Sequence, residues 1–437
     1  MVKVSVLVPI CNVETYLEQC LSSLSGQDMK DMEIICLNDG STDRSSEIAH
    51  KFEHEDTRFR VIDKENSGYG KTMNLGLSLA KGEYIGIVES DDYIEPDMFS
   101  YLYGTAKTYD ADVVKSAFWV HTNGYDAFND VIFDDLYDQM LSSDRNPEVF
   151  DRNPSIWSNL YRREFLAGNK ISFFESPGAS FQDIAWRVKV FAKAKKAVFV
   201  KKAFYHYRRD NMNASVRNDG KLFCVRDEYD EAERFLETDR QWDERFKYLL
   251  PYLRWGHYTW NCFDRWLSIG SRWQFFKSMH DEFARYEEEG LLKRDYWNKE
   301  QWLNVNRMLC DSRQFFYDRY VSFLRKSILT EGFFPALNIA PKLAIYGAGK
   351  VGKEALAVLS AYGKPPACFV VTDMDGNEEK LENIPVMPVD ALLPDKEQCV
   401  VLIAVAASAQ PEIFEQLLVR GFKHIVAFLP EFRQILR

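Results

Sequence analysis

The chain has 437 residues, which is too long for one ordinary hydrophobic core, and we expect two or three domains. The composition is that of a soluble globular protein, although 14% of the residues are aromatic. The formal net charge of −11 argues against a nucleic-acid-binding protein, because such proteins need a dominant positive field.

The apolar stretch at the start of the sequence is too short for a signal peptide. No run of about eighteen or more apolar residues occurs, so the sequence predicts no membrane span. The eight cysteines are scattered and form no CxxC pair. We therefore expect a cytoplasmic protein.

Strands and helices are predicted to alternate over the first 115 or so residues. A turn and a Ser or Thr helix cap are expected at Ser41 or Thr42, with a helix running to about residue 54. Strands alternating with helices predict a doubly wound parallel sheet with its loops at one edge. The apolar runs that predict strands are residues 3–9, 32–37, 59–62 and 84–88.

Three carboxylates, Glu89, Asp91 and Asp92, follow the fourth predicted strand. They would repel one another unless a cation or solvent lay among them. Mg²⁺ or Mn²⁺ held by carboxylates together with substrate phosphates fits this chemistry. The alternative is a solvated acidic turn, because Ser-Asp-Asp is also ordinary loop composition.

Polar residues also follow the second and third predicted strands. Asp39 comes after the second strand, and a loop with Asn66, Gly68 and Lys71 comes after the third. The carboxyl ends of parallel strands face one crevice, where an aspartate can accept hydrogen bonds from N–H groups or ribose hydroxyls. Glycines allow the backbone to approach a diphosphate, and Lys71 could neutralise it. The sequence thus predicts a nucleotide-diphosphate and metal site, although Asp39 alone could be an Asx-turn residue.

The segments VSVLVPICNVETYLEQCLSSL, NDGSTD and NSGYGKTMNLGLSLAKGEYIGIVESDDYIEPD closely resemble the family 2 glycosyltransferases of GT-A fold. The resemblance covers about the first hundred residues. It implies that Pro9, Asn12, Asp39 and Asp91 contact the sugar-nucleotide donor and that Asp91 and Asp92 hold a divalent metal. It also places the Asn66, Gly68 and Lys71 loop at the donor.

One residue of the acidic motif departs from the family pattern. Glu89 stands where relatives usually have the first aspartate, and its side chain reaches about one methylene further. Glu89 is a candidate metal residue that could contact the metal through water, or it could turn to the ribose.

Residues 116–215 are interpreted as the acceptor half, and the segment SIWSNLYRREFL (155–166) resembles the family segment just before the acceptor site. Relatives carry Glu-Asp at the position of Gln182 and Asp183, and their carboxylate deprotonates the acceptor hydroxyl. A sugar hydroxyl is a poor nucleophile at neutral pH and needs a general base within hydrogen-bond reach. Only Asp183 can serve here, and neutral Gln182 should leave its pKa less raised than in a paired site. The alternative role for Asp183, which is compatible with catalysis, is to cap a helix.

Cationic residues gather between positions 193 and 209. Relatives often place a His or Arg near the donor diphosphate, so the resemblance implies that His206 and Arg208 stabilise the departing UDP-type group. For the lysines we favour a solvated face over contact with an anionic membrane or a lipid-diphosphate acceptor. These lysines are Lys193, Lys195, Lys196, Lys201 and Lys202.

The remainder of the chain predicts a helical, aromatic-rich region followed by a Rossmann-like α/β domain. The helical region should use its aromatics for packing. The last domain has a strand, then Gly347-x-Gly349-x-x-Gly352, then a helix, with Asp373 after the next strand. A lone GxGxxG is a weak signal, so we expect a packing turn in a docking or dimerising domain rather than NAD(P) binding.

The predicted domains are a GT-A domain over 1–215 (donor half 1–115, acceptor half 116–215), a helical region over 216–338 and a Rossmann-like domain over 339–437. The predicted function is inverting, metal-dependent transfer of a sugar from a nucleotide-diphosphate donor, with UDP favoured, to a hydroxyl of a growing surface or lipid-linked glycan. An NAD(P)-linked sugar-nucleotide oxidoreductase is one alternative. A noncatalytic nucleotide-sugar-binding protein is another, because Glu89 and Gln182 depart from the family pattern.

Overall fold

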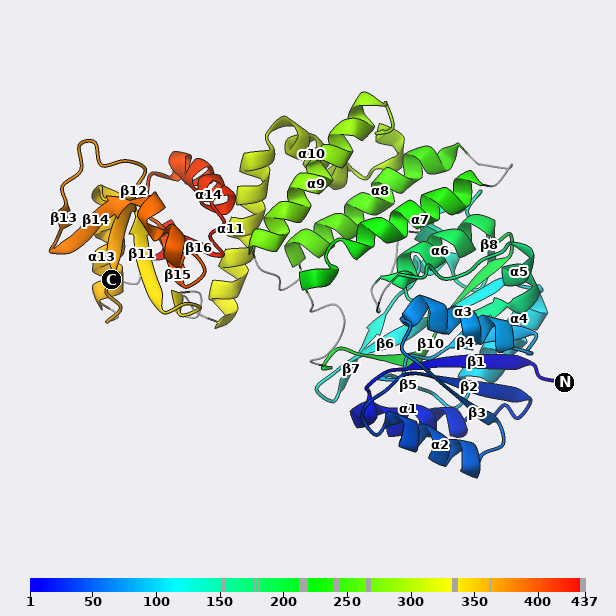
Figure 1. Ribbon diagram of the computed structural model, residues 1–437. Helices are drawn as coiled ribbons and strands as arrows, with labels where there is room; N and C mark the ends of the chain where they lie inside the picture. The colour runs from blue at the N-terminus through cyan, green and yellow to red at the C-terminus, as the bar shows by residue number, and fades with distance from the viewer. Residues whose placement is uncertain are drawn as a thin grey trace. The chain divides into compact units, whose positions relative to one another are not determined.

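The computed structural model describes residues 1–150, 154–176, 178, 181–211, 219–238, 244–264, 269–331, 337–361 and 363–432. The chain divides into an N-terminal unit, residues 1–217 with 223–246, and a C-terminal unit, residues 218–222 with 247–437 (Figure 1). Helix α7 (Cys224–Glu237), which falls in the predicted helical region, belongs to the N-terminal unit. The three predicted domain boundaries stay predictions.

The N-terminal unit is built on one sheet of order β3-β2-β1-β4-β9-β6-β10-β5, with β7 on β6 and β8 on β10. Its first four strands, β1 to β4, are parallel to one another, as the sequence predicted. Every residue of β1 is buried, which is typical of a parallel strand covered on both faces. The strands are β1 (Val4–Ile10), β2 (Met32–Asp39), β3 (Phe59–Lys64), β4 (Tyr84–Ile87), β5 (Tyr93–Ile94), β6 (Val113–Thr122), β7 (Tyr125–Asn129), β8 (Met140–Leu141), β9 (Asn159–Arg162) and β10 (Ala197–Arg208).

The other half of this sheet is mixed. Strand β9 runs antiparallel to both β4 and β6, and β10 runs parallel to β6. Strand β5 directly follows residues 89–92, which we call the acidic loop, and pairs antiparallel with β10, where Tyr93 lies opposite His206. This pairing brings the C-terminal part of β10 beside the acidic loop.

Figure 1 shows α1 and α2 on one face of the first strands and α3 on the other. The predicted Ser or Thr cap of α2 is wrong: Arg44 occupies the N-cap position, and the N–H of Ser45 donates to Asp43 Oδ1 (3.0 Å). The helices of this unit besides α7 are α1 (Glu14–Ser25), α2 (Ser45–Glu55), α3 (Tyr69–Leu79), α4 (Met98–Tyr109), α5 (Arg163–Gly168) and α6 (Gln182–Lys193).

The C-terminal unit contains a second sheet of order β13-β14-β12-β11-β15-β16. Strand β11 is parallel to β12 and β15, and helix α13 follows β11, as expected for a Rossmann-like domain. Its elements are β11 (Lys342–Tyr346), α13 (Lys350–Ala361), β12 (Cys368–Val371), β13 (Lys380–Leu381), β14 (Ile384–Pro388), β15 (Cys399–Ile403), α14 (Gln410–Val419) and β16 (His424–Ala427).

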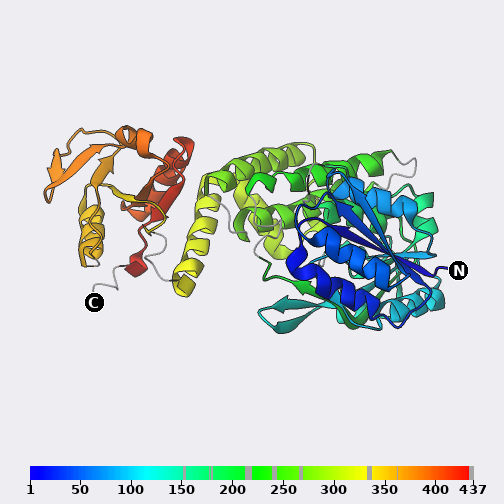
Figure 2. The ribbon, with the colours of Figure 1, turned by 60° about the horizontal axis from the view of Figure 1, so that its bottom comes forward.

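The helices of the C-terminal unit carry the aromatic core that the sequence predicted. Trp255, Trp273 and Trp297 are all buried, in line with packing. The hydroxyl of Tyr320 donates to Ile425 O (2.6 Å), so these helices and the second sheet are joined within one unit (Figure 2). The helices are α8 (Arg245–Thr259, in this unit from Lys247), α9 (Ile269–Glu288), α10 (Lys299–Cys310) and α11 (Ser312–Glu331). Among the described residues, no helix is both long and apolar enough to cross a membrane.

Candidate functional site

The loops after β1 and β2 are bonded to each other at the carboxyl edge of the sheet. Asn12, with a left-handed φ of 50°, accepts the N–H of Thr42 at Oδ1 (2.8 Å). The N–H of Asn12 donates to Ser41 Oγ (3.1 Å). These bonds occupy the Ser and Thr that were expected to cap α2. Pro9 is buried within β1, opposite Leu37.

Asp39 ends β2 and organises the loop after β3. Its carboxylate accepts the N–H groups of Ser67 (2.8 Å) and Gly68 (3.0 Å) and forms an ion pair with Lys64. Asn66 donates from Nδ2 to Asp39 O (2.9 Å). Burial opposes ionisation, but the Lys64 and Ser67 hydrogen bonds outweigh it and lower the pKa of Asp39. Asp39 is therefore a fixed, ionised acceptor at the strand end.

Lys64 is the cation of this loop, and sequence reasoning missed it. Its ammonium group also donates to Ser67 Oγ (2.7 Å) and Thr72 Oγ1 (3.1 Å). Lys71, the predicted cation, is exposed on α3. The signal that could have found Lys64 is register, because it lies directly opposite Asp39 in the parallel pairing of β2 and β3.

The glycines at the start of α3 face a second chain segment, which we call the acceptor segment (residues 171–176 and 178). A Cβ on Gly70 would lie 2.0 Å from Phe174 O, and one on Gly68 would lie 3.0 Å from Gly178 N. The N–H of Tyr69 donates to Gly178 O (3.0 Å). The close approach made possible here is that of the acceptor segment, while contact with a diphosphate stays a prediction.

Within the acidic loop, Asp92 bonds the loop to strand β10. It is 2% exposed, accepts the N–H of Arg208 at Oδ1 (2.7 Å) and accepts the hydroxyl of Tyr205 at Oδ2 (2.8 Å). Burial, reinforced by the charge of Asp91, raises the pKa of Asp92 well above its usual range. Both oxygens of Asp92 thus serve to hold the loop on β10.

Glu89 and Asp91 are half-buried and better placed to meet a ligand. Glu89 accepts the hydroxyl of Tyr69 at Oε1 (2.7 Å), and Asp91 accepts Nδ2 of Asn211 at Oδ2 (2.9 Å). The second oxygen of each carboxylate makes no hydrogen bond to a described residue. Burial, with the charges of Asp91 and Asp183, raises the pKa of Glu89 to about 7.

No group of three or more His, Cys, Asp or Glu side chains within the described ranges is arranged to hold a metal ion. Mg²⁺ needs only one or two carboxylates when substrate phosphates complete its shell. Glu89 and Asp91 fit that requirement with one open oxygen each. Asp92 does not fit it, because both of its oxygens bond to β10.

Asp183 lies in the first turn of α6 beside the acidic loop. Burial raises the pKa of Asp183 to about 6, against the effect of the Arg187 guanidinium and the helix N–H groups, which lower it. Its charge contributes to the raised pKa of Glu89, which places the two carboxyls near each other. Asp183 is not the N-cap residue, because Phe181 occupies that position without a side-chain cap bond, but its carboxylate still meets the backbone N–H groups of residues 183 and 184 in the first turn.

The neighbour of Asp183 serves the acceptor segment. Gln182 is 5% exposed, and its Nε2 donates to Ser176 Oγ (3.1 Å) and Gly178 O (3.4 Å). An amide can donate these bonds, whereas an ionised carboxylate at this position could only accept.

A second carboxyl of the site comes from α7, and sequence reasoning missed it. Glu228 is 1% exposed, and burial, followed by the charge of Asp183, raises its pKa to about 9. The nearby charged side chains of Lys189 and Glu231 have smaller, opposite effects on it. Its position depends on the packing of α7 against α6, for which the sequence holds no signal.

Of the two predicted diphosphate-binding cations, Arg208 lies at the acidic loop. Its Nε donates to Asp91 O (2.9 Å) and its Nη2 to Gln19 Oε1 (2.7 Å). Aromatic rings of Tyr16 and Tyr93 lie under the guanidinium, 4.9 and 5.7 Å from it.

His206 occupies a different environment. It is 7% exposed, stacks on Tyr93 with ring centroids 4.3 Å apart, and has Nε2 2.9 Å from Glu95 Oε1. Its Nδ1 lies 3.3 Å from Asp126 Oδ1. The contacts of His206 thus tie β5 to the β6–β7 hairpin, and its role toward a diphosphate stays a prediction.

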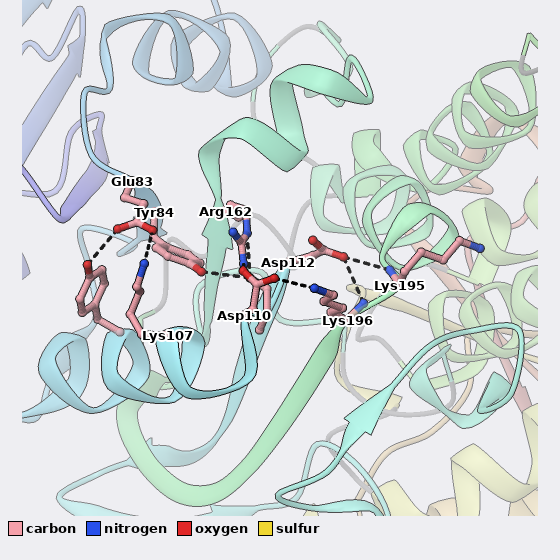
Figure 3. Close-up of polar contacts among 10 residues, drawn as sticks. Glu83, Tyr84, Lys107, Asp110, Asp112, Arg162, Lys195 and Lys196 are labelled. Atoms are coloured by element: carbon pink, nitrogen blue, oxygen red, sulfur yellow. Dashed lines mark hydrogen bonds and ion pairs between the residues drawn. The ribbon is translucent and has the colours of Figure 1, made fainter.

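The opposite edge of the sheet, at the start of β4, is held by ion pairs (Figure 3). Arg162 lies opposite Tyr84 and bonds Asp110, which also pairs with Lys196 at 2.5 Å. Four predicted surface lysines carry aspartate partners, as a solvated face would, and membrane contact stays a prediction. The pairs are Lys195–Asp144, Lys196–Asp110, Lys201–Asp134 and Lys202–Asp97.

In the C-terminal unit, two of the three motif glycines are required by packing. A Cβ on Gly347 would lie 2.8 Å from Ala404 O, and one on Gly352 would lie 1.9 Å from Gly347 O. A Cβ on Gly349 would meet nothing within 4 Å. Asp373 is exposed, and its Oδ1 accepts the N–H of Asp375 (3.0 Å). The turn therefore has a structural reason to exist, and nucleotide binding there stays a prediction.

Residues 5–167 match the model of glycosyl transferase family 2. The chain is 32% identical over 280 residues to the putative glycosyltransferase EpsH of Bacillus subtilis, covering 63% of this chain and 80% of that protein. It is 33% identical over 242 residues to the glycosyltransferase GlyG of Streptococcus pneumoniae, covering 51% of this chain and 76% of that protein.

The fold is similar to that of S. aureus TarS residues 1–349, solved in complex with UDP-GlcNAc, with a TM-score of 0.56 and 20% identity. That similarity covers 76% of this chain and 93% of the TarS chain. The family match, the curated relatives and the mixed GT-A-type sheet agree with one another. The chain belongs to glycosyl transferase family 2 and is a glycosyltransferase.

Proposed function

We propose that the protein is an inverting, metal-dependent glycosyltransferase that uses a nucleotide-diphosphate sugar, with UDP favoured, and a hydroxyl of a growing surface or lipid-linked glycan. The observation that carries this proposal is the half-buried Asp183 beside Glu89, both next to a strand-end edge lined by Asp39 and Asp91. The UDP-GlcNAc complex of the structurally similar TarS supports a uridine nucleotide as donor.

The residues divide into donor and acceptor roles. Asp39 is held ionised by Lys64, and its Oδ1 is filled by Lys64 and Ser67. Its Oδ2 accepts only the Gly68 N–H among the described residues and keeps one acceptor position for the nucleoside at the carboxyl end of β2. Arg208, the last residue of β10, bonds to the acidic loop through Asp91 O, and its positive charge there can stabilise the departing diphosphate. A divalent metal held by Asp91 and Glu89 would supply Lewis-acid neutralisation of that diphosphate.

Asp183 is the group suited to take the acceptor proton. With a pKa of about 6, its carboxyl is mostly ionised at neutral pH and can accept a proton from a sugar hydroxyl. The hydroxyl oxygen then bonds to the anomeric carbon while the bond to the diphosphate breaks on the opposite face, which inverts the configuration. Glu228 cannot take this role at neutral pH, because its pKa of about 9 keeps it protonated.

The deciding experiment is to incubate the purified chain with a panel of nucleotide sugars and Mn²⁺ and to measure release of the nucleoside diphosphate. Asp183→Asn should lose about 10²- to 10⁴-fold in turnover, the usual worth of a general base, and still bind donor. Asp134→Asn, an exposed aspartate paired with Lys201, is the matched control and should behave as wild type.

Two further results bear on the finer parts of the proposal. Transfer that continues undiminished in excess EDTA would refute the metal requirement. Near-normal turnover of Asp183→Asn would refute the assignment of Asp183 as the general base. Inversion is checked by the anomeric configuration of the product in NMR spectra. The cytoplasmic location, contact with the inner face of the membrane, and self-association through the C-terminal domain stay predictions.

A further inference from the structure

Tyr69, the first residue of α3, stands at the junction of the donor and acceptor halves of the site. Its hydroxyl donates to Glu89 Oε1 at 2.7 Å, and its backbone N–H donates to Gly178 O at 3.0 Å. The first bond reaches the acidic loop and the second reaches the acceptor segment. One residue thus contacts both halves.

The ring of Tyr69 is also connected, through two other aromatic rings, to helix α6, which carries Asp183. It packs edge-on against Phe173 of the acceptor segment, with centroids 5.8 Å apart. Phe173 in turn stacks on Trp186, with centroids 4.0 Å apart and ring planes 11° from parallel. Trp186 lies one turn after Asp183 on α6, so this aromatic stack connects Tyr69 to the turn that bears Asp183.

The length of the side chain at position 89 matches this arrangement. Glutamate extends about 1.5 Å further than aspartate, one C–C bond. That extension lets the carboxylate of Glu89 reach the Tyr69 hydroxyl while its backbone stays bonded to β10, where the N–H of Glu89 donates to Tyr205 OH (3.0 Å). Oε2 makes no hydrogen bond to a described residue.

We propose that Tyr69 is a positioning residue that orients the Glu89 carboxylate for the donor. Through the Phe173–Trp186 stack, Tyr69 also fixes the position of Asp183 relative to Glu89. The inference rests on the proposed function, because it assigns Glu89 to the donor and Asp183 to the acceptor. It also gives a structural reason for glutamate at position 89, because this side chain reaches the Tyr69 hydroxyl: Glu89 and Tyr69 act as a pair.

The test is a double-mutant cycle with Tyr69→Phe, Glu89→Asp and the double variant, measured as kcat and KM for donor and acceptor. Tyr69→Phe keeps the ring and should lower kcat about tenfold or more, as expected for loss of a hydrogen bond to a charged group, with the acceptor KM little changed. In the Glu89→Asp background the same change should have no further effect, because the shorter carboxylate no longer reaches the hydroxyl.

Tyr103→Phe is the matched control. The Tyr103 hydroxyl donates to Glu83 Oε2 at 2.8 Å, and its ring packs edge-on against Tyr84, at the edge of the sheet far from Glu89. It should keep wild-type kcat, while its thermal midpoint should change as much as that of Tyr69→Phe. A purely structural role for Tyr69 would move the midpoint and leave kcat alone.

The outcomes separate the two proposals. Wild-type protein without transfer of any nucleotide sugar would refute the proposed function and the role of Tyr69 with it. An active wild type with Tyr69→Phe equal to Tyr103→Phe would overturn the inference alone. Full additivity with Glu89→Asp would also overturn it, because Tyr69 would then act independently of Glu89.

Discussion

The pH dependence of transfer is the sharpest consequence of the site around Asp183. The carboxyl must be ionised to accept the acceptor proton, and its pKa is raised to about 6 because it is buried. The value of kcat/KM should therefore be high above pH 6 and fall as the pH drops through 6.

The size of the effect follows from the ionised fraction. With a pKa of about 6, roughly nine tenths of Asp183 is ionised at pH 7 and roughly one tenth at pH 5. From Asp183 alone we expect kcat/KM at pH 5 to be about one tenth of its value at pH 7, and protonation of Glu89, whose pKa is raised to about 7, should lower it further. The assay is initial-rate release of the nucleoside diphosphate in buffers of constant ionic strength and metal concentration.

A variant assigns this acidic limb to Asp183. The Arg187 guanidinium, one turn along α6, lowers the pKa of Asp183 and is not among the groups that act on Glu89. Arg187→Met should move the limb to higher pH, whereas Arg187→Lys keeps the charge and should leave it in place. A rate that stays flat between pH 5 and 7, or a limb unmoved by Arg187→Met, would refute the assignment of Asp183 as base.

Three further predictions concern stability and the second sheet. Gly70→Ala should destabilise the protein and reduce transfer, because its Cβ would lie 2.0 Å from a backbone oxygen of the acceptor segment. The exposed helical control Gly104→Ala should raise the unfolding free energy in urea by about 0.5–1 kcal/mol, and equal behaviour of the two would count against this packing. Glu228→Gln should raise the unfolding free energy at pH 8 by about 1–3 kcal/mol and hardly change it at pH 4. The reason is that the native state, with a Glu228 pKa of about 9, keeps a proton that the unfolded chain releases above about pH 4.5. An equal gain at both pH values would contradict this. Gly352→Ala should lower the melting temperature and Gly349→Ala should not, and calorimetric titration with NAD⁺ should show no binding; measurable binding would revive a nucleotide role for this motif.

Several elements of the site were predictable because they depend on local pattern. Buried apolar runs separated by helical spacing predict parallel strands, and parallel strands bring their carboxyl ends to one edge. That reasoning located Asp39 and the acidic loop correctly at the ends of β2 and β4. It also predicted the strand, glycine turn and helix that open the second sheet.

Other residues escaped prediction because their roles come from contacts between segments distant in the chain. Lys64, rather than Lys71, pairs with Asp39 because β3 extends two residues beyond the predicted end and registers with β2. Asp92 bonds to β10 through partners more than a hundred residues away, so an acidic motif alone could not separate it from Asp91.

The amino-acid sequence by itself determined the order of strands and helices, the edge at which the polar loops gather, and the family. Periodicity and short motifs carry that information, because each element buries its own apolar face. Only the tertiary structure decided which acidic side chains hold the loops together and which ones can take or hold a proton. Docking of the acceptor segment and of α7 set which carboxyls lie near one another and how far each is removed from water, and those two quantities control their protonation.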